Sequence, residues 1–457
     1  MTLPDPTDGL PDPSETPRRE FLKAAVALGG AAGLSACLEA PRAGSGADGG
    51  AEADGTDGGA SDLADVPTGD PAALPDRQHA WNDALPTDED GNVRPPRHHV
   101  LRYAGLAVDP TDDKEREAAR ETLREALSAL ERAFAWSNEG LLFTVGYASA
   151  YFDRFDASLP ASVDLPAPTA LTDMEDPAFD EAPLLAHLAS DAPAALLSAD
   201  EALFGEATTV RSGERAESVP DLSGVLDPVD RRTGFVGAGL PREHRGVSGL
   251  PEDAPIPEGA PLMMGFRNGF RASQATEDRV TIAEGPFSGA TTQHVAALRL
   301  QLNAWWRQES HAQRVAKLFS PVHAAEERVG DWGEKLGADP AVADLPEDAV
   351  AYARESGVVG HAQKAARARE DGAPLLLRRD FDTTDGDHAG VHFLTNQRRI
   401  EEFVRVRAAM TGADIADETA VGSRVNNGIL QYVFVRRRGN YLLPPRRHRA
   451  LPTPTPE

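Results

Sequence analysis

Cysteine, lysine and long apolar runs are scarce in this 457-residue sequence. Its single cysteine, Cys37, excludes an intramolecular disulfide and a cluster of cysteine metal ligands. Only five of the 46 basic residues are lysines, against 73 Asp and Glu, and the net charge is −27. A surface this acidic repels phosphate groups, so we expect no nucleic-acid partner. Because the Debye length falls to about 3 Å at about 1 M salt, the composition also predicts a salt-adapted, halophilic protein.

The N-terminal segment, residues 1–37, resembles an export signal. Arg18 and Arg19 precede a run of small apolar residues, 24–33, as in twin-arginine signals, and this run is too short to span a bilayer. The sequence Leu-Ser-Ala-Cys that ends at Cys37 resembles a lipobox. We therefore expect export by the twin-arginine route and lipid anchoring on the outer face of the cell membrane. A cleaved soluble signal and a simple membrane anchor are the alternatives.

Residues 38–78 are mainly Gly, Ala, Asp, Ser and Pro, which predicts a disordered acidic tether. After it, strand and helix signals alternate as in ferredoxin-like units, so we expect an α+β fold with a first half at 79–260 and a second half at 261–457. Residues 205–260 have little periodicity and are predicted to be surface loops. Strands are expected at residues 100–108, 140–145, 184–188, 374–377, 390–394 and 429–435 (an edge strand), and helices at 112–136, 192–204, 293–318 and 396–409.

The stretch from residue 358 to residue 399 carries the clearest chemistry. His361 begins an Ala-rich basic run, residues 374–377 form an apolar segment that ends at Arg378, and residues 390–394 are apolar again. One imidazole and one guanidinium between apolar strands suit a buried anionic or metal-centred ligand. An ordinary polar histidine and an arginine salt bridge are the alternative. No Ser/His/Asp order, phosphate-binding glycine loop or zinc-ligand spacing stands out.

The order of these features resembles the C-terminal half of the dye-decolourising (DyP-type) haem peroxidases: a His, a basic run, an apolar segment ending in two Arg, an acidic turn, then Gly-apolar-x-Phe-Leu-x-x-Gln. The resemblance covers much of residues 98–445 and is closest to a deferrochelatase-like exported member. It implies two ferredoxin-like halves that form one haem-binding domain of the dimeric α+β barrel type, with haem b between the sheet and helices of the second half. It also implies hydrogen peroxide and a small reductant as substrates, and it is compatible with an oligomer.

This resemblance gives roles to individual residues. His361 corresponds to the proximal ligand of the haem iron, and Arg378 to the arginine over the distal face. Val391 and Phe393 take the places of distal apolar residues. Each of these roles is an expectation that depends on the haem being bound.

The segment Gly265-Phe266-Arg267-Asn268-Gly269 resembles the distal loop of that family, but Asn268 replaces its Asp. In the family this Asp carries a proton between the peroxide oxygens. An amide cannot do so, and losing a general acid/base costs roughly 10²–10⁴ in rate. We therefore expect a weakened peroxidase. The alternative is a catalytically silent or haem-handling surface lipoprotein that keeps the fold.

Other residues compete with these roles or depart from the pattern. Gln363 stands where family members often carry an Arg near a haem propionate, and Lys364 could partly replace that charge. His294, expected to begin a helix, is a rival axial ligand. A small metal site is the hypothesis for another set, although solvated loops are the alternative: Asp385, Asp387, His388 and His392.

Overall fold

The computed structural model describes residues 61–343, 345 and 349–457, of which Leu63–Glu457 form one unit. The export signal, Cys37 and residues 38–60 of the predicted tether lie outside the described residues. Among the helices that the structure does describe, none combines the length and the apolar character needed to cross a membrane.

The first half is built on four antiparallel strands in the order β7-β1-β4-β2. Its elements are β1 (His98–Leu106), α3 (Asp113–Ala133), β2 (Leu142–Ala148), β4 (Leu184–Ser190), α5 (Pro193–Phe204) and β7 (Leu226–Phe235). Asp112 caps α3 by accepting hydrogen bonds from the backbone N–H groups of Lys114 and Glu115. The buried face of α3, which includes Leu123 and Leu127, packs in the same apolar core as α5. Strand order and helix positions are those of a ferredoxin-like unit.

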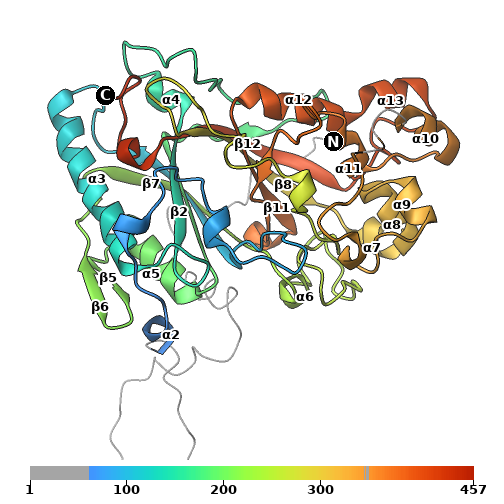
Figure 1. Cartoon of the computed structure of the whole chain (residues 1–457), viewed down its shortest axis with the longest axis horizontal. Coiled ribbons are helices and arrows are strands. Elements are labelled where there is room, and N and C mark those ends of the chain that lie inside the picture. The colour runs from blue at the N-terminus through green and yellow to red at the C-terminus, as the bar shows by residue number, and fades with distance from the viewer. Residues whose placement is uncertain (1–60, 344, 346–348) are drawn as a thin grey trace, which may run out of the picture. The chain divides into compact units, whose positions relative to one another are not determined.

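The second half repeats this arrangement, with the strand order β12-β8-β11-β9. Its strands are β8 (Thr291–Leu300), β9 (Leu377–Arg378), β10 (Phe381–Thr383), β11 (Gly390–Gln397) and β12 (Val433–Leu443). Its helices are α7 (Asn303–Arg307), α8 (His311–Leu318), α9 (Pro321–Ala325), α10 (Ala349–Ser356), α11 (His361–Ala366), α12 (Ile400–Thr411) and α13 (Ala413–Glu418). These helices gather at the end of the unit away from α3 and α5 (Figure 1).

The two halves close into a ring of eight antiparallel strands. β12 of the second half pairs with β2 of the first, and β10 pairs with both β7 and β11, so the order is β10-β7-β1-β4-β2-β12-β8-β11 and back to β10. The interior of the ring is filled by aromatic and aliphatic side chains such as Tyr103, Phe381 and Tyr441. This confirms the predicted α+β fold of two ferredoxin-like halves joined as a barrel.

The remaining short elements lie outside the ring. β3 (Ala178–Phe179) adds to β12 in parallel, and β5 (Thr209–Ser212) and β6 (Arg215–Ser218) form a separate hairpin. α2 (Ser61–Ala64), α4 (Ser149–Phe152) and α6 (Leu240–Glu243) are single turns.

Four predictions from the sequence were wrong. Residues 293–318 are not one helix: β8 comes first, because its residues are buried on both sides and no alternation is visible. The strand expected at residues 429–435 is β12, which lies between β2 and β8 rather than at an edge. The loops expected at 205–260 contain β7. Residues 63–78 are not a tether, since Val66 is buried in the core and the Gln78 side chain bonds to backbone groups of Val145 and Pro444.

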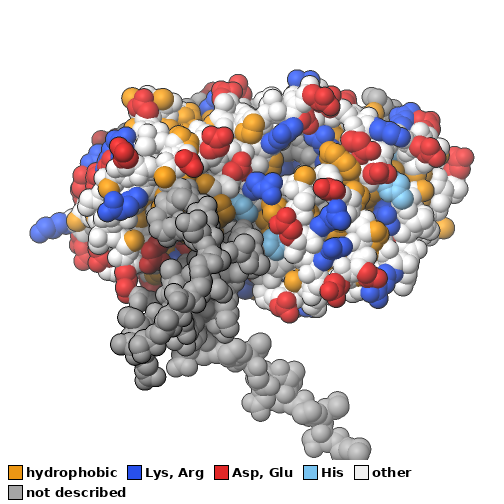
Figure 2. All heavy atoms as spheres, turned by 90° about the horizontal axis from the view of Figure 1, so that it is seen from below, with side chains coloured by type: hydrophobic (Ala, Val, Ile, Leu, Met, Phe, Trp, Pro, Cys, Tyr) orange, Lys and Arg blue, Asp and Glu red, His pale blue; other side chains and the backbone are white. Residues whose placement is uncertain are grey.

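Charge is distributed by pairing rather than by segregation. Acidic and basic side chains alternate over the face shown in Figure 2. Arginines are frequent between residues 436 and 449, and buried carboxylates balance the charge of three of them. Arg438 pairs with Glu175, and Arg446 and Arg449 both pair with Glu131. These three arginines are therefore paired with carboxylates inside the fold.

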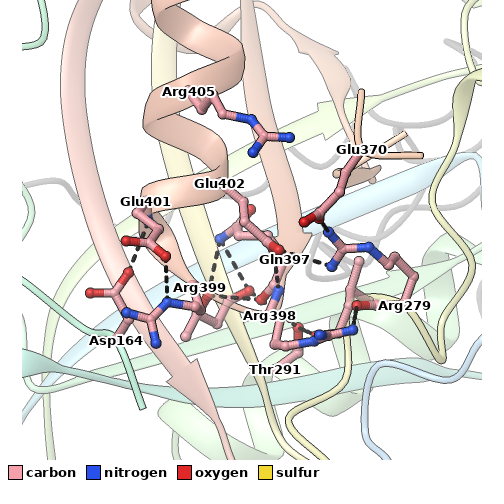
Figure 3. A network of polar contacts seen from close by, with 12 residues as sticks. Asp164, Arg279, Thr291, Glu370, Gln397, Arg398, Arg399, Glu401, Glu402 and Arg405 are labelled. Carbon is pink, nitrogen blue, oxygen red and sulfur yellow. Dashed lines mark hydrogen bonds and ion pairs between the residues drawn. The ribbon is translucent and has the colours of Figure 1, made fainter. Parts of the chain in front are cut away.

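A polar network fixes the start of α12 against the sheet (Figure 3). Glu402 accepts hydrogen bonds from the Arg279 guanidinium at 2.9 Å and from the Arg398 backbone N–H at 3.0 Å. The Arg398 guanidinium in turn donates to the backbone carbonyl of Arg279 at 3.0 Å, and Arg279 also pairs with Glu370. The network matters for function because α12 carries one wall of the cavity described next.

Candidate functional site

One cavity lies between the outer face of the second-half strands and the helices that cover them. β8, β11 and β12 contribute its floor, and α11 and α12 its roof. Most of its lining is aliphatic or aromatic. Six of the eight residues predicted for the site line it together: Phe266, Asn268, His361, Arg378, Val391 and Phe393. The other two, Gly265 and Gly269, are part of the loop that positions Phe266 and Asn268.

His361 is the first residue of α11 and reaches the cavity from the helical side. Two glycines let its backbone lie this deep. A Cβ on Gly360 would stand 1.7 Å from the Phe319 carbonyl oxygen, and a Cβ on Gly428 would stand 3.1 Å from the His361 Cα. The ring Nδ1 is buried and has no hydrogen-bond partner among the residues that the structure places.

The imidazole of His361 is held in its neutral form. Burial and, to a smaller extent, the positive charges of Lys364, Arg378 and Arg407 together lower its pKa to about 3. A neutral imidazole keeps a lone pair free at physiological pH, which is the state that binds a metal.

The glycine loop gives Asn268 its place. Gly265 and Gly269 have φ of 83° and 73°, in the left-handed region that favours glycine. A Cβ on Gly265 would lie 2.5 Å from the indole ring of Trp306, so a larger residue does not fit there. The Trp306 Nε1 donates a hydrogen bond to the backbone carbonyl of Met263. Phe266 and Asn268 then line the cavity, and the Asn268 Nδ2 donates a hydrogen bond to Asp380 Oδ2.

Arg378 lines the cavity with a guanidinium that has no bonding partner among the described residues. Its backbone is fixed to Gln274, whose Oε1 accepts from the Arg378 N–H at 3.0 Å. The neighbouring Arg379 points to the other side of the strand and bonds to Asn82 and Glu277. An unpaired guanidinium at a cavity wall is available to an anion or to a developing negative charge.

Two carboxyl groups that the sequence reasoning missed share the cavity with Arg378. Asp380 and Asp382 both line it. Burial raises the pKa of Asp380, against the opposing effects of Arg378 and Asn268, and raises the pKa of Asp382 well above its usual range. The signal was present in the sequence, since residues 378, 380 and 382 alternate along an extended segment and fall on one face.

The rival assignments are not supported by the geometry. His294 lies in β8, where Nδ1 contacts Asn440 Oδ1 at 2.8 Å and Nε2 contacts the Arg438 guanidinium at 3.0 Å, so neither ring nitrogen is free. Lys364 cannot replace a propionate-binding Arg because its ammonium donates to the carbonyls of Met410 and Asn427. Gln363 is buried and does not line the cavity.

The small metal site suggested for the 385–392 segment is also not assembled. His388 Nε2 is taken by the guanidinium of Arg299 at 2.6 Å, and His392 Nε2 lies 3.4 Å from Asp385. In the part of the chain that the structure describes, no group of three or more His, Cys, Asp or Glu side chains is placed to hold a metal ion.

The cavity fits a flat, largely apolar group that carries a metal ion able to bind one imidazole. Its aliphatic and aromatic walls suit a porphyrin, the neutral His361 with an unpartnered Nδ1 suits an axial ligand, and the guanidinium of Arg378 suits a small anionic or peroxidic partner. The residues present therefore fit a haem.

Comparison with known proteins gives a family and a fold. Residues 96–445 match a family of unknown function (DUF7405). No curated protein sequence matches the chain. Ferric DtpA from Streptomyces lividans is similar in structure, with a TM-score of 0.51, 17% identity, and coverage of 77% of this chain and 90% of that one.

Two further solved structures are similar at lower scores. A DyP-type peroxidase from Cellulomonas bogoriensis has a TM-score of 0.49 and 16% identity, covering 79% of this chain and 93% of its own. A dye-decolorizing protein from V. cholerae has a TM-score of 0.45 and 13% identity, covering 81% and 98%. At 17% identity the likeness to DtpA is one of fold alone.

Proposed function

The chain belongs to a family of unknown function (DUF7405), so we propose its function from its own site: a haem-dependent peroxidase that reduces hydrogen peroxide with a small electron donor. One observation carries the proposal. Separate segments of the second half bring a neutral imidazole, an unpaired guanidinium and an amide–carboxyl pair to the same apolar cavity.

In this proposal His361 holds the iron of haem b, and Phe266, Val391 and Phe393 exclude water from the cavity. The bound haem supplies the electron-transfer chemistry between the donor and peroxide. Arg378 binds the peroxide and stabilises negative charge on its oxygen, because a guanidinium stays charged and donates in a fixed fork.

The sequence also supports a location for this activity. We propose that the chain is a deferrochelatase-like member exported by the twin-arginine route and anchored by lipid at Cys37, working in a salt-rich medium. The support is the Arg18-Arg19 pair, the position of the sole cysteine and the net charge of −27. Expression of Cys37→Ala tests it: the variant should move from the membrane fraction to the medium, and an unchanged membrane fraction contradicts the anchor.

Haem titration followed by visible absorbance tests the function. The wild type should bind one haem and show a Soret band, and His361→Ala should lose that band or shift it as the axial ligand is removed. His388→Ala is the matched control, since His388 lies outside the cavity. Identical spectra for wild type and His361→Ala would contradict the ligand assignment.

Peroxide consumption with an oxidisable dye then separates peroxidase action from its rivals. A peroxidase consumes peroxide and oxidises the dye in proportion. A silent binding protein takes up haem and does neither, and a haem-handling protein releases free iron or porphyrin. Product analysis of the same reaction distinguishes the three.

A further inference from the structure

A carboxyl group lies beside the amide that the sequence puts in place of the proton carrier. Asn268 occupies the loop position at which an acid would be needed, and its amide can orient but not transfer a proton. Its Nδ2 donates to Oδ2 of Asp380, and both residues line the cavity. The amide and the carboxyl are therefore neighbours within one site.

Asp380 also lies on the same face of the chain as Arg378. The two residues are separated by Arg379, which points to Trp81 and Glu277 on the other side, so the backbone alternates as in a strand. A peroxide that reaches the Arg378 guanidinium is thus next to a carboxyl as well as to a cation.

Asp382 is a poorer candidate for proton transfer, although it lines the same cavity. One of its oxygens is fixed by the backbone N–H of Met263 at 2.6 Å, and it pairs with β7 where the ring closes. Arg378 lowers the pKa of Asp380 but is not among the groups that shift the pKa of Asp382. The carboxyl closest in electrostatic terms to the guanidinium is Asp380.

We propose that Asp380 is the catalytic proton carrier of this cavity, with Asn268 as the residue that positions it. This inference rests on the proposed peroxidase function. In the step assigned to Asp380, an O–H bond of hydrogen peroxide breaks and an O–H bond forms on the carboxylate. The hydroperoxide anion remains beside Arg378, and the proton is later returned to the other oxygen. No electrons change hands in this step.

The environment of Asp380 shifts its pKa and holds its carboxyl group in place. Burial raises the pKa of Asp380, while the charge of Arg378 and the hydrogen bond from Asn268 keep it from rising freely. A general acid/base is most effective when its pKa approaches the working pH. The amide of Asn268 does not titrate, and it fixes the carboxyl group by donating a hydrogen bond to Oδ2.

The test uses near-isosteric exchanges in the full-length, haem-loaded protein. Asp380→Asn removes the carboxyl and keeps its shape. The double variant Asn268→Asp/Asp380→Asn keeps one carboxyl and one amide in the pair, but it places the carboxyl at position 268 and the amide at position 380. Asp371→Asn is the matched control, because Asp371 is an exposed residue on the same connection and outside the cavity. Asp382→Asn tests whether the other carboxyl group of the cavity transfers the proton instead.

Two readouts are needed. The first is the rate of peroxide consumption: Asp380→Asn should lower it by roughly 10²–10⁴-fold without changing haem absorbance, and the double variant should recover most of the loss. The second is independent of activity. A carboxyl carbon resonance of 13C-labelled aspartate in the haem-free protein should titrate above the usual Asp range and be absent from Asp380→Asn.

The outcomes separate this inference from the proposed function. If wild type loaded with haem does not consume peroxide, both are wrong. If wild type is active and Asp380→Asn stays within about threefold of it, the proton carrier is another group and only the inference fails. A larger loss in Asp382→Asn than in Asp380→Asn would move the role to Asp382. Loss in Asp380→Asn with recovery in the double variant supports Asp380, even if the single variant is less stable.

Discussion

Acidification should destabilise the protein through histidines that are buried in their neutral form. His79, His187 and His294 are at most 2% exposed, and burial lowers the pKa of each from 6.5 to about 3. In the unfolded chain these rings take up a proton near the ordinary value, whereas in the folded protein they do not. Because the folded-state pKa is the lower one, stability is complete above about pH 6.5 and is lost as the pH falls below it.

The size of the effect follows from the difference in pKa. At about pH 5.5 each unfolded ring is protonated roughly tenfold over neutral, which costs about 1.4 kcal/mol for each histidine kept neutral. The three together lower the free energy of unfolding by about 4 kcal/mol, a large share of the roughly 5–15 kcal/mol typical of a folded domain. Asp380 and Asp382 act in the opposite direction, since burial raises their pKa and the folded state then binds the extra protons. These two carboxyl groups therefore offset part of the loss that the three histidines cause.

A single variant isolates the histidine contribution. His79 contacts Thr281 Oγ1 through Nε2 at 2.9 Å, an interaction that a glutamine amide can also make, and it lies away from the cavity. Urea denaturation of wild type and His79→Gln at about pH 7.5 and about pH 5.5 should show that the variant loses about 1.4 kcal/mol less on acidification. The same pair at the higher pH is the control. If both proteins lose the same free energy, His79 is not kept neutral by the fold and the reasoning is refuted.

Two further substitutions test how the site and the core are built. Gly428→Ala adds a Cβ 3.1 Å from His361 at φ +61°, so it should weaken haem binding and cost about 1–2 kcal/mol of stability; Gly372→Ala, with φ +77° and open space around it, should cost similar stability and leave the haem titration unchanged. Glu131→Gln leaves Arg446 and Arg449 without their buried partner and should cost roughly 3–5 kcal/mol in denaturation. A loss below about 1 kcal/mol would mean that water replaces the carboxylate.

The sequence order was sufficient to find residues on both the helical and the strand side of the cavity. His361, Arg378, Val391 and Phe393 belong to one stretch of chain with distinct residue types at distinct positions, and the structure brings all four to the same cavity. Asp380 was not predicted, because its role follows from the alternation of side chains along residues 378–382 and not from its residue type. The hydrogen bond between Asn268 and Asp380 joins residues that are 112 positions apart, so no local sequence pattern could predict it.

Two strands were not predicted, one because both of its faces are buried and the other because it contains a β-bulge. β8 contacts the ring interior on one side and the cavity on the other, so its apolar residues do not alternate with polar ones. β7 contains Pro228, a residue that is unfavourable inside a strand. The pairing with β1 shifts register between Tyr103 and Ala104, next to this proline, and the bulge accommodates it. β12 was expected at an edge because its partners come from both halves and only the closed ring places it between them.

The first half contributes no residue to the cavity lining, yet it sets the position of the segment that carries Arg378, Asp380 and Asp382. The single residue pair between β7 and β10 joins Phe235 to Asp382, and a Cβ on the adjacent Gly234 would stand 2.3 Å from the Asp382 carbonyl oxygen. The first half therefore holds Asp382 in position through β7, although it lines no part of the cavity. A methyl group added at Gly234 would displace the Asp382 backbone and so disturb a site that Gly234 does not touch.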